Sequence, residues 1–236
     1  MHPRTVTHAL IALLLTPAAC SDVAEPSVAG TDGVTASNHL VFDCAAQASI
    51  PASECAGLVA LFIATDGDDW TDNTGWLVAG DPCTWVGVTC VSGSAATLDL
   101  HSNQLTGSIP TSIGDLTGLT RLNLSVNQLT GTIPAEFGNL VHLLLLSLGR
   151  NALSGSIPSE LGGLLDLRIL DLQVNQLDGP IPSELGGLVD LEFLDLGHNQ
   201  LTGGIPISFG GLVALKSLDL SVNPLGGAIP AELGNL

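Results

Sequence analysis

Residues 119–141 have the sequence LTRLNLSVNQLTGTIPAEFGNLV, and this stretch decides the fold because the chain repeats it every 24 residues. An Ile-Pro pair recurs in one column of the repeat, from Ile109-Pro110 to Ile229-Pro230. Asparagine recurs in a second column, at Asn103, Asn127, Asn151, Asn175, Asn199 and Asn223. Self-similarity at a fixed period of this length predicts a stack of structural repeats in which each repeat contacts its neighbours.

The physical chemistry of one repeat follows from its residues. Apolar and polar residues alternate over residues 121–125, which predicts a short strand with one buried face. One strand cannot bury that face alone, so the copies must form a parallel sheet at about 4.8 Å per repeat. The column asparagine can donate to and accept from backbone groups in the turn that follows. Residues 136–140 then predict a short helical or 3-10 turn on the opposite side.

The form LxxLxLxxNxLxGxIPxxLGxL resembles the plant-specific class of leucine-rich repeats, found in plant receptor kinases and polygalacturonase-inhibiting proteins. The resemblance covers residues 44–236. It implies an α/β solenoid: a right-handed superhelix with a parallel sheet on its concave face, short helical or 3-10 turns on its convex face, and a second short sheet at the LxGxIP segment. We expect six 24-residue repeats over residues 95–236, the last incomplete.

The first 40 residues predict export. Residues 9–15 (ALIALLL) form an apolar run of signal-peptide length, too short to span a bilayer. Residues 17–21 (PAACS) resemble a bacterial lipobox, which implies a signal peptide over residues 1–19 and a lipid on Cys20. The proline departs from the Leu-like residue of that motif, so an ordinary signal-peptidase site is the alternative. The composition of residues 20–40 predicts a flexible tether.

Residues 41–94 are expected to cap the open end of the stack, because that end would otherwise expose its apolar core. Pro51 and Glu54 favour the start of a helix. Residues 83–90 (CTWVGVTC) resemble the N-terminal cap of plant-type repeat proteins, in which the two cysteines form a disulfide. The four cysteines other than Cys20 allow three pairings. We expect Cys44–Cys55 and Cys83–Cys90, each closing a local loop, and therefore an oxidising compartment.

Two rows of side chains are expected on the concave face, the usual contact surface of the resembled family. The first row contains the apolar residues Leu145, Ile169 and Phe193, which predict a contact site, although long aliphatic side chains could merely pack on each other. The second row contains Asp171, Asp195 and Asp219. They predict an acidic docking stripe, with a calcium site or plain solvated residues as alternatives. Arg121 and Arg150 are further candidate ligand contacts.

The composition and the motifs of the sequence restrict the functions that the chain can have. The chain has 23 acidic and 5 basic residues, a formal net charge of −18, which disfavours nucleic acid and anionic lipid as partners. No catalytic motif, phosphate loop or metal-ligand spacing is present, so we expect neither an enzyme nor a cofactor nor a metal site.

We therefore expect an exported, membrane-anchored interaction module that binds a protein or peptide through its concave face. A cationic ligand is among the expected partners. The module is anchored by a lipid to the cell membrane or outer membrane, or else secreted. The alternatives are a cell-wall or glycan binder and the ectodomain of a receptor kinase that continues beyond Leu236. Chain association at the uncapped C-terminal edge is also expected.

Overall fold

Parallel strands of the 24-residue repeat form the main layer of the molecule. The computed structural model describes residues 42–78 and 80–236. The predicted signal peptide, lipidation site and tether lie outside the described residues. Within those residues the long sheet has seven strands, in the order β1 (Val88–Val91), β2 (Ser94–Asp99), β3 (Arg121–Asn123), β4 (Leu145–Ser147), β6 (Ile169–Asp171), β8 (Phe193–Asp195) and β10 (Ser217–Asp219).

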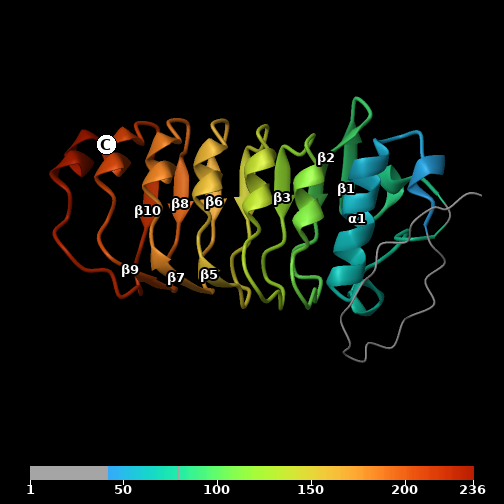
Figure 1. Ribbon diagram of the computed structural model, residues 1–236, viewed down its shortest axis with the longest axis horizontal. Coiled ribbons are helices and arrows are strands. Elements are labelled where there is room, and N and C mark those ends of the chain that lie inside the picture. The colour runs from blue at the N-terminus through green and yellow to red at the C-terminus, as the bar shows by residue number, and fades with distance from the viewer. Residues whose placement is uncertain (1–41, 79) are drawn as a thin grey trace, which may run out of the picture. The chain divides into compact units, whose positions relative to one another are not determined.

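The register of this sheet equals the sequence period. Strand β1 pairs with β2 in the antiparallel sense, and every later pair is parallel. Leu122 pairs with Leu146, and Leu146 pairs with Leu170, so each strand meets its copy 24 residues along the chain. These central leucines are fully buried, which confirms the predicted strand with one buried face. Figure 1 shows the repeats side by side in chain order.

The second short sheet implied by the resemblance is also present. It contains β5 (Ser154–Ser156), β7 (Gln176–Pro180) and β9 (Gln200–Thr202), paired in parallel. A 3-10 helix follows the Ile-Pro pair of each repeat, at Thr111–Asp115, Ala135–Asn139, Ser159–Gly163, Ser183–Gly187, Ile207–Gly211 and Ala231–Asn235. The apolar residue in the middle of each helix points inward, and Phe137 and Leu161 are fully buried. These features confirm the leucine-rich repeat solenoid.

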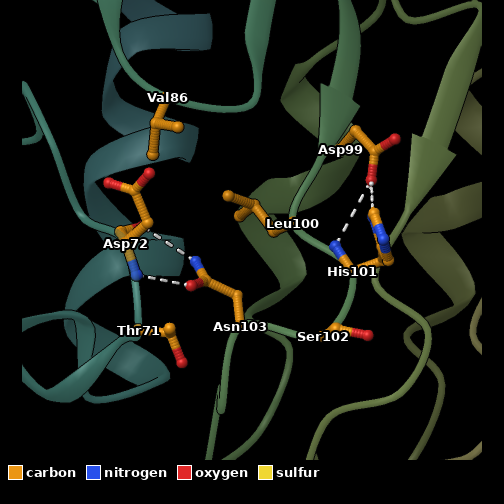
Figure 2. A pocket seen from close by; sticks show the side chains of 8 residues that line it. All are labelled: Thr71, Asp72, Val86, Asp99, Leu100, His101, Ser102 and Asn103. Atoms are coloured by element: carbon orange, nitrogen blue, oxygen red, sulfur yellow. Dashed lines mark hydrogen bonds and ion pairs between the residues drawn. The ribbon is translucent and has the colours of Figure 1, made fainter.

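The asparagine column joins each repeat to the one before it. The side-chain amide of Asn175 donates to the carbonyls of Leu148 and Leu172 at 3.1 and 3.2 Å, and its oxygen accepts from the Leu153 amide at 3.0 Å. Asn103 bonds both backbone groups of Asp72 in the cap, at 2.7 and 2.9 Å (Figure 2). Backbone groups that the tight turn leaves unpaired are satisfied in this way.

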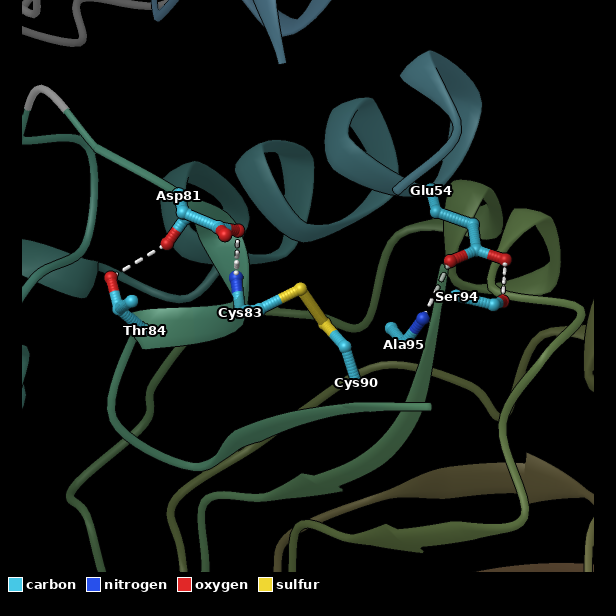
Figure 3. Close-up of a disulfide and its surroundings, with 7 residues drawn as sticks. All are labelled: Glu54, Asp81, Cys83, Thr84, Cys90, Ser94 and Ala95. Atoms are coloured by element: carbon cyan, nitrogen blue, oxygen red, sulfur yellow. Dashed lines mark hydrogen bonds between the residues drawn. A yellow bond between two sulfur atoms is a disulfide. The ribbon is translucent and has the colours of Figure 1, made fainter. Parts of the chain in front are cut away.

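The cap contains one α-helix, α1 (Ala52–Ala64), and the 3-10 helices Cys44–Ala46, Gly67–Asp69 and Pro82–Thr84. Glu54 lies in the first turn of α1, where an acid interacts favourably with the helix dipole. The residue is nevertheless only 2% exposed, which is unusual for a glutamate. It accepts hydrogen bonds from the Ser94 hydroxyl and, at 2.8 Å, from the Ala95 amide (Figure 3). Glu54 therefore ties α1 to the start of β2.

Both predicted disulfides are confirmed. Cys44 is bonded to Cys55, and Cys83 is bonded to Cys90. Figure 3 shows the second bond, which links the helix Pro82–Thr84 to β1. The cap core is aromatic, since Trp70, Trp76 and Trp85 are all buried and Trp76 lies within 5 Å of both other indole rings, at centroid distances of 4.9 and 4.8 Å.

Candidate functional site

The exposed side of strands β2, β3, β4, β6, β8 and β10, here called the strand face, is the surface on which the sequence analysis places its candidate contacts. Each of these strands has a leucine that faces the core; it is buried in β2 to β8 and half-buried in β10. Because side chains alternate along a strand, the residues on both sides of that leucine point to the opposite face. The strand face therefore presents two side-chain rows, each with one residue per repeat.

The first of these, the apolar row, consists of Leu145, Ile169 and Phe193. The three residues are direct partners on β4, β6 and β8. Leu145 and Ile169 are half-buried, and Phe193 is 44% exposed. Phe193 is thus the most exposed of the three, and its aromatic ring is the apolar surface most available to a ligand.

The acidic row consists of Asp171, Asp195 and Asp219, which are direct partners on β6, β8 and β10. Each carboxylate accepts a hydrogen bond from the backbone amide two residues further on, at distances of 3.2, 3.0 and 2.8 Å. The Ser147 hydroxyl also donates to Asp171 at 3.0 Å. The aspartates therefore close the turn after each strand while they keep a negative charge on the surface.

A shallow depression of about 320 Å³ lies where the two rows meet. It joins apolar and acidic walls, since its lining residues are Ile169, Leu170, Asp171, Gln173, Phe193, Leu194, Asp195, Ser217 and Asp219. Five of the eight predicted ligand contacts are thus brought together in one place: Ile169, Phe193, Asp171, Asp195 and Asp219. The sixth, Leu145, lies beside them as the strand partner of Ile169.

The aspartates of the acidic row differ in their electrostatics. Burial raises the pKa of Asp195, and the neighbouring carboxylates of Asp219 and Asp171 raise it further, against a hydrogen bond from the Gly197 amide. Hydrogen bonds from Ser221 lower the pKa of Asp219. Asp195 is therefore the member of the row whose negative charge is least compensated within the chain.

The two arginines lie apart from the depression. Arg121 is exposed on β3 beside Leu145, and Arg150 is exposed in the turn after β4 with a positive φ of 58°. In the part of the chain that the structure describes, neither arginine forms an ion pair. The structure therefore separates the two arginines from the acidic row by one or two repeats.

Two glycines next to the acidic row contribute to this surface, although the sequence did not identify them as site residues. A Cβ atom on Gly149 would lie 2.6 Å from a carboxylate oxygen of Asp171. A Cβ on Gly197 would lie 3.2 Å from the carboxylate of Asp219. Both positions are one repeat before the aspartate that they accommodate. Only the stacking of repeats reveals that these glycines leave room for carboxylates.

A second depression, of about 420 Å³, lies between the cap and the first repeat (Figure 2). Asp72 and Asp99 line it, together with His101, whose ring nitrogen lies 3.0 Å from a carboxylate oxygen of Asp99. Hydrogen bonds from Thr74 lower the pKa of Asp72. His101 is exposed. The side-chain amide of Asn103, which also lines the depression, donates its hydrogen bond to the Asp72 carbonyl in the cap.

Among the residues that the structure describes, no group of three or more His, Cys, Asp or Glu side chains is placed to hold a metal ion. Over those same residues, no helix combines the length and the apolar character needed to cross a membrane.

Several solved structures share this architecture. The PEPR1–AtPEP1 crystal structure has a TM-score of 0.70 and 34% identity, and the match covers 78% of this chain and 26% of that one. The Arabidopsis receptor kinase HAESA, in complex with the peptide hormone IDA and the co-receptor SERK1, has a TM-score of 0.67 and 34% identity over 78% of this chain and 32% of that one. The chain thus spans between a quarter and a third of these two receptor chains.

The match to a smaller ectodomain is nearly complete. The leucine-rich repeat ectodomain of the receptor kinase SOBIR1 from Arabidopsis thaliana has a TM-score of 0.66 and 31% identity over 77% of this chain and 98% of that one. Family models described as leucine-rich repeats match residues 96–116, 118–140, 142–164 and 167–225. The chain belongs to the leucine-rich repeat family.

Proposed function

We propose that this protein is an exported interaction module whose strand face binds an extended segment of a protein or peptide. The fold is typical of non-enzymatic interaction modules. The similar HAESA structure is a complex with a peptide hormone, and RGFR1, another similar structure, is a peptide hormone receptor in complex with RGF2. The observation that carries the proposal is the depression at which the apolar row meets the acidic row. An exposed apolar patch with a polar rim is the usual composition of a protein contact site.

The depression also restricts the chemistry of the ligand. Phe193 and Ile169 offer an apolar surface for one large side chain, and the acidic row offers three carboxylates about 5 Å apart beside it. A ligand with a basic side chain next to an apolar one satisfies both walls. Arg121 on β3 and Arg150 in the turn after β4, one or two repeats away, then favour an acidic group or a chain carboxylate in the same ligand.

Selection from a phage-displayed library of random peptides tests the proposal without knowledge of the natural partner. We expect the chain to enrich peptides that pair a basic with a large apolar residue. The triple variant Leu145→Ser, Ile169→Ser and Phe193→Ser should lose binding of the enriched peptides, while it keeps the far-ultraviolet circular dichroism of the parent.

A matched control separates the apolar row from exposed apolar residues in general. Ile63, Val91 and Ile207 are 57%, 60% and 67% exposed and lie outside the strand face. Their triple substitution by Ser should leave peptide binding intact. Equal loss of binding in both triple variants would place the contact elsewhere, and enrichment without basic residues would contradict the role given to the acidic row.

We also propose that Cys20 carries a lipid that anchors this module to a membrane. The two disulfides and the extracellular character of the similar ectodomains support export. Fractionation of cells that express the Cys20→Ser variant tests the anchor. The variant should move from the membrane fraction to the soluble exported fraction, whereas unchanged membrane association would exclude lipidation as the cause.

A further inference from the structure

Charged side chains follow a fixed order along the strand face and the turns at its edge. An acid comes first, Asp99 on β2, and two bases follow, Arg121 on β3 and Arg150 in the turn after β4. The three carboxylates of the acidic row come last, on β6, β8 and β10. Asp99 shares the column of that row, since the strand register is continuous from β2 through β3 and β4 to β6. Carboxylates therefore lie towards both ends of the strand face, and the two arginines lie between them.

The depression between the cap and the first repeat, here called the cap-junction depression, surrounds the first of these acids. Asp72 and Asp99 line it, with Leu100 between them (Figure 2). The amide and the ring nitrogen of His101 both contact the same oxygen of Asp99, Oδ1, at 3.3 and 3.0 Å. Within the described part of the chain Oδ2 makes no hydrogen bond, and the Asp99 side chain is 47% exposed. A basic side chain can reach this oxygen while its aliphatic stem lies on Val86 and Leu100.

The acidic row has a carboxylate of the same kind at Asp195. The Gly197 amide donates to its Oδ1 at 3.0 Å, and its Oδ2 accepts no hydrogen bond from the described residues. Asp171, in contrast, uses both oxygens, one for the Gln173 amide and one for the Ser147 hydroxyl. The strands β2 and β8 are four strand spacings apart, which is about 19 Å. An extended chain rises about 3.3 Å per residue, so about six residues of a ligand reach from one carboxylate to the other.

We propose that the strand face binds an extended segment with two basic residues about six positions apart and an acidic residue between them. This binding mode rests on the proposed function and adds the cap-junction depression as a second contact. The depression at Phe193 holds one basic residue beside a large apolar one, and Asp72 and Asp99 hold the other. Arg121, which forms no ion pair within the described residues, meets the acidic residue. Complementary charge of this kind determines which partner binds and in which register.

Synthetic copies of the peptides enriched from the phage-displayed library test this proposal with the full chain. We expect them to carry a second basic residue at one preferred distance from the first. Fluorescence anisotropy at about 20 mM NaCl, where screening is weak, measures their affinity. The double variant Asp72→Asn and Asp99→Asn keeps acceptors for the Thr74 and His101 amides, and it should bind roughly 10-fold more weakly. Changing the second basic residue of the peptide to Gln should weaken binding to the parent equally and to the variant no further, which is the signature of direct contact.

A matched control removes the same charge elsewhere. Asp166 and Asp190 are exposed and lie outside the strands of the strand face, so the double variant Asp166→Asn and Asp190→Asn should bind the peptides like the parent. Equal weakening by both double variants would mean that net charge alone attracts the ligand, and this result overturns the proposal. Additive losses, or a second basic residue without a preferred distance, overturn it as well. In these cases the proposed function stands if the peptides still require Phe193, whereas a library without enriched peptides contradicts the proposed function itself.

Discussion

Single asparagine side chains hold the turns of this solenoid together. Asn175 makes hydrogen bonds to three backbone carbonyls and one backbone amide, and two of these four groups belong to the preceding repeat. An alanine in its place removes the side-chain partner of these four backbone groups in a partly buried turn. The neighbouring Gln176 is exposed and offers a matched control.

Asn175→Ala should therefore lower the free energy of unfolding by about 1–3 kcal/mol for the unpaired groups it leaves. Gln176→Ala should change it by less than about 0.5 kcal/mol, as is usual for surface substitutions. Urea unfolding followed by circular dichroism measures both. Equal stability of the two variants would show that water or a shifted turn satisfies the carbonyls of Leu148 and Leu172.

The pKa shifts of Asp195 and Asp219 have opposite signs. Replacing each aspartate by asparagine should therefore have opposite effects on the stability of the chain. A raised pKa means that the native state holds the Asp195 proton more tightly than the unfolded state, so stability decreases as pH rises through the ordinary range of Asp. The lowered pKa of Asp219 gives stability above that range that is lost as pH falls.

At pH 7, Asp195→Asn should thus raise the stability of the chain and Asp219→Asn should lower it. The effect of Asp195→Asn should largely vanish at about pH 3, where this carboxyl group is protonated in both states. The effect of Asp219→Asn should only decrease there, because its lowered pKa keeps the native carboxylate ionised to lower pH than the unfolded one. Urea midpoints at both pH values provide the measurement. Shifts of the same sign at pH 7 would contradict the difference in environment described for the two carboxylates.

At the scale of elements, the cap helix is joined to the sheet through one buried carboxylate. Glu54→Ala removes the acceptor of the Ala95 amide and the Ser94 hydroxyl, which should destabilise the cap by about 1–3 kcal/mol. All three tryptophans of the chain are buried in the cap core, so tryptophan fluorescence reports on the cap. Its unfolding midpoint should shift, whereas exposed Ser53→Ala should leave it unchanged.

This experiment also separates two views of the cap. If the fluorescence midpoint decreases while the circular dichroism midpoint stays constant, the cap unfolds separately from the repeats. If both decrease together, the cap and the stack form one cooperative unit, as expected of adjoining repeats with strong interfaces. An unchanged fluorescence midpoint would mean that Glu54 contributes nothing to the link between α1 and β2.

At the scale of the whole molecule, net charge opposes the stacked state. The sequence has a formal charge of −18, and the repeats hold equivalent acidic residues close together. The Debye length shrinks from about 30 Å at 0.01 M salt to about 10 Å at 0.1 M, so added salt should screen this repulsion. We expect Tm to rise between 10 and 500 mM NaCl, with KCl giving the same curve. A Tm independent of salt would mean that local pairing already compensates the charge.

Much of the architecture could be predicted from the sequence, because a fixed period determines the register. The central leucines, both disulfides, the second sheet and the pairing of Ile169 with Phe193 follow from which residues share a column. The depression between the apolar and acidic rows was not predicted, although its residues were. Its shape depends on how the side chains of three adjacent strands pack beside one another, and the sequence period does not contain that information.

The sequence by itself determined the repeat, the core and the rows, since these depend only on spacing and on burial of apolar side chains. Only the tertiary structure decided what each repeat imposes on its neighbour. Val126, Val174 and Val222 adopt positive φ angles of 58°, 53° and 54°, which isolated β-branched residues avoid. Hydrogen bonds between adjacent turns override that preference.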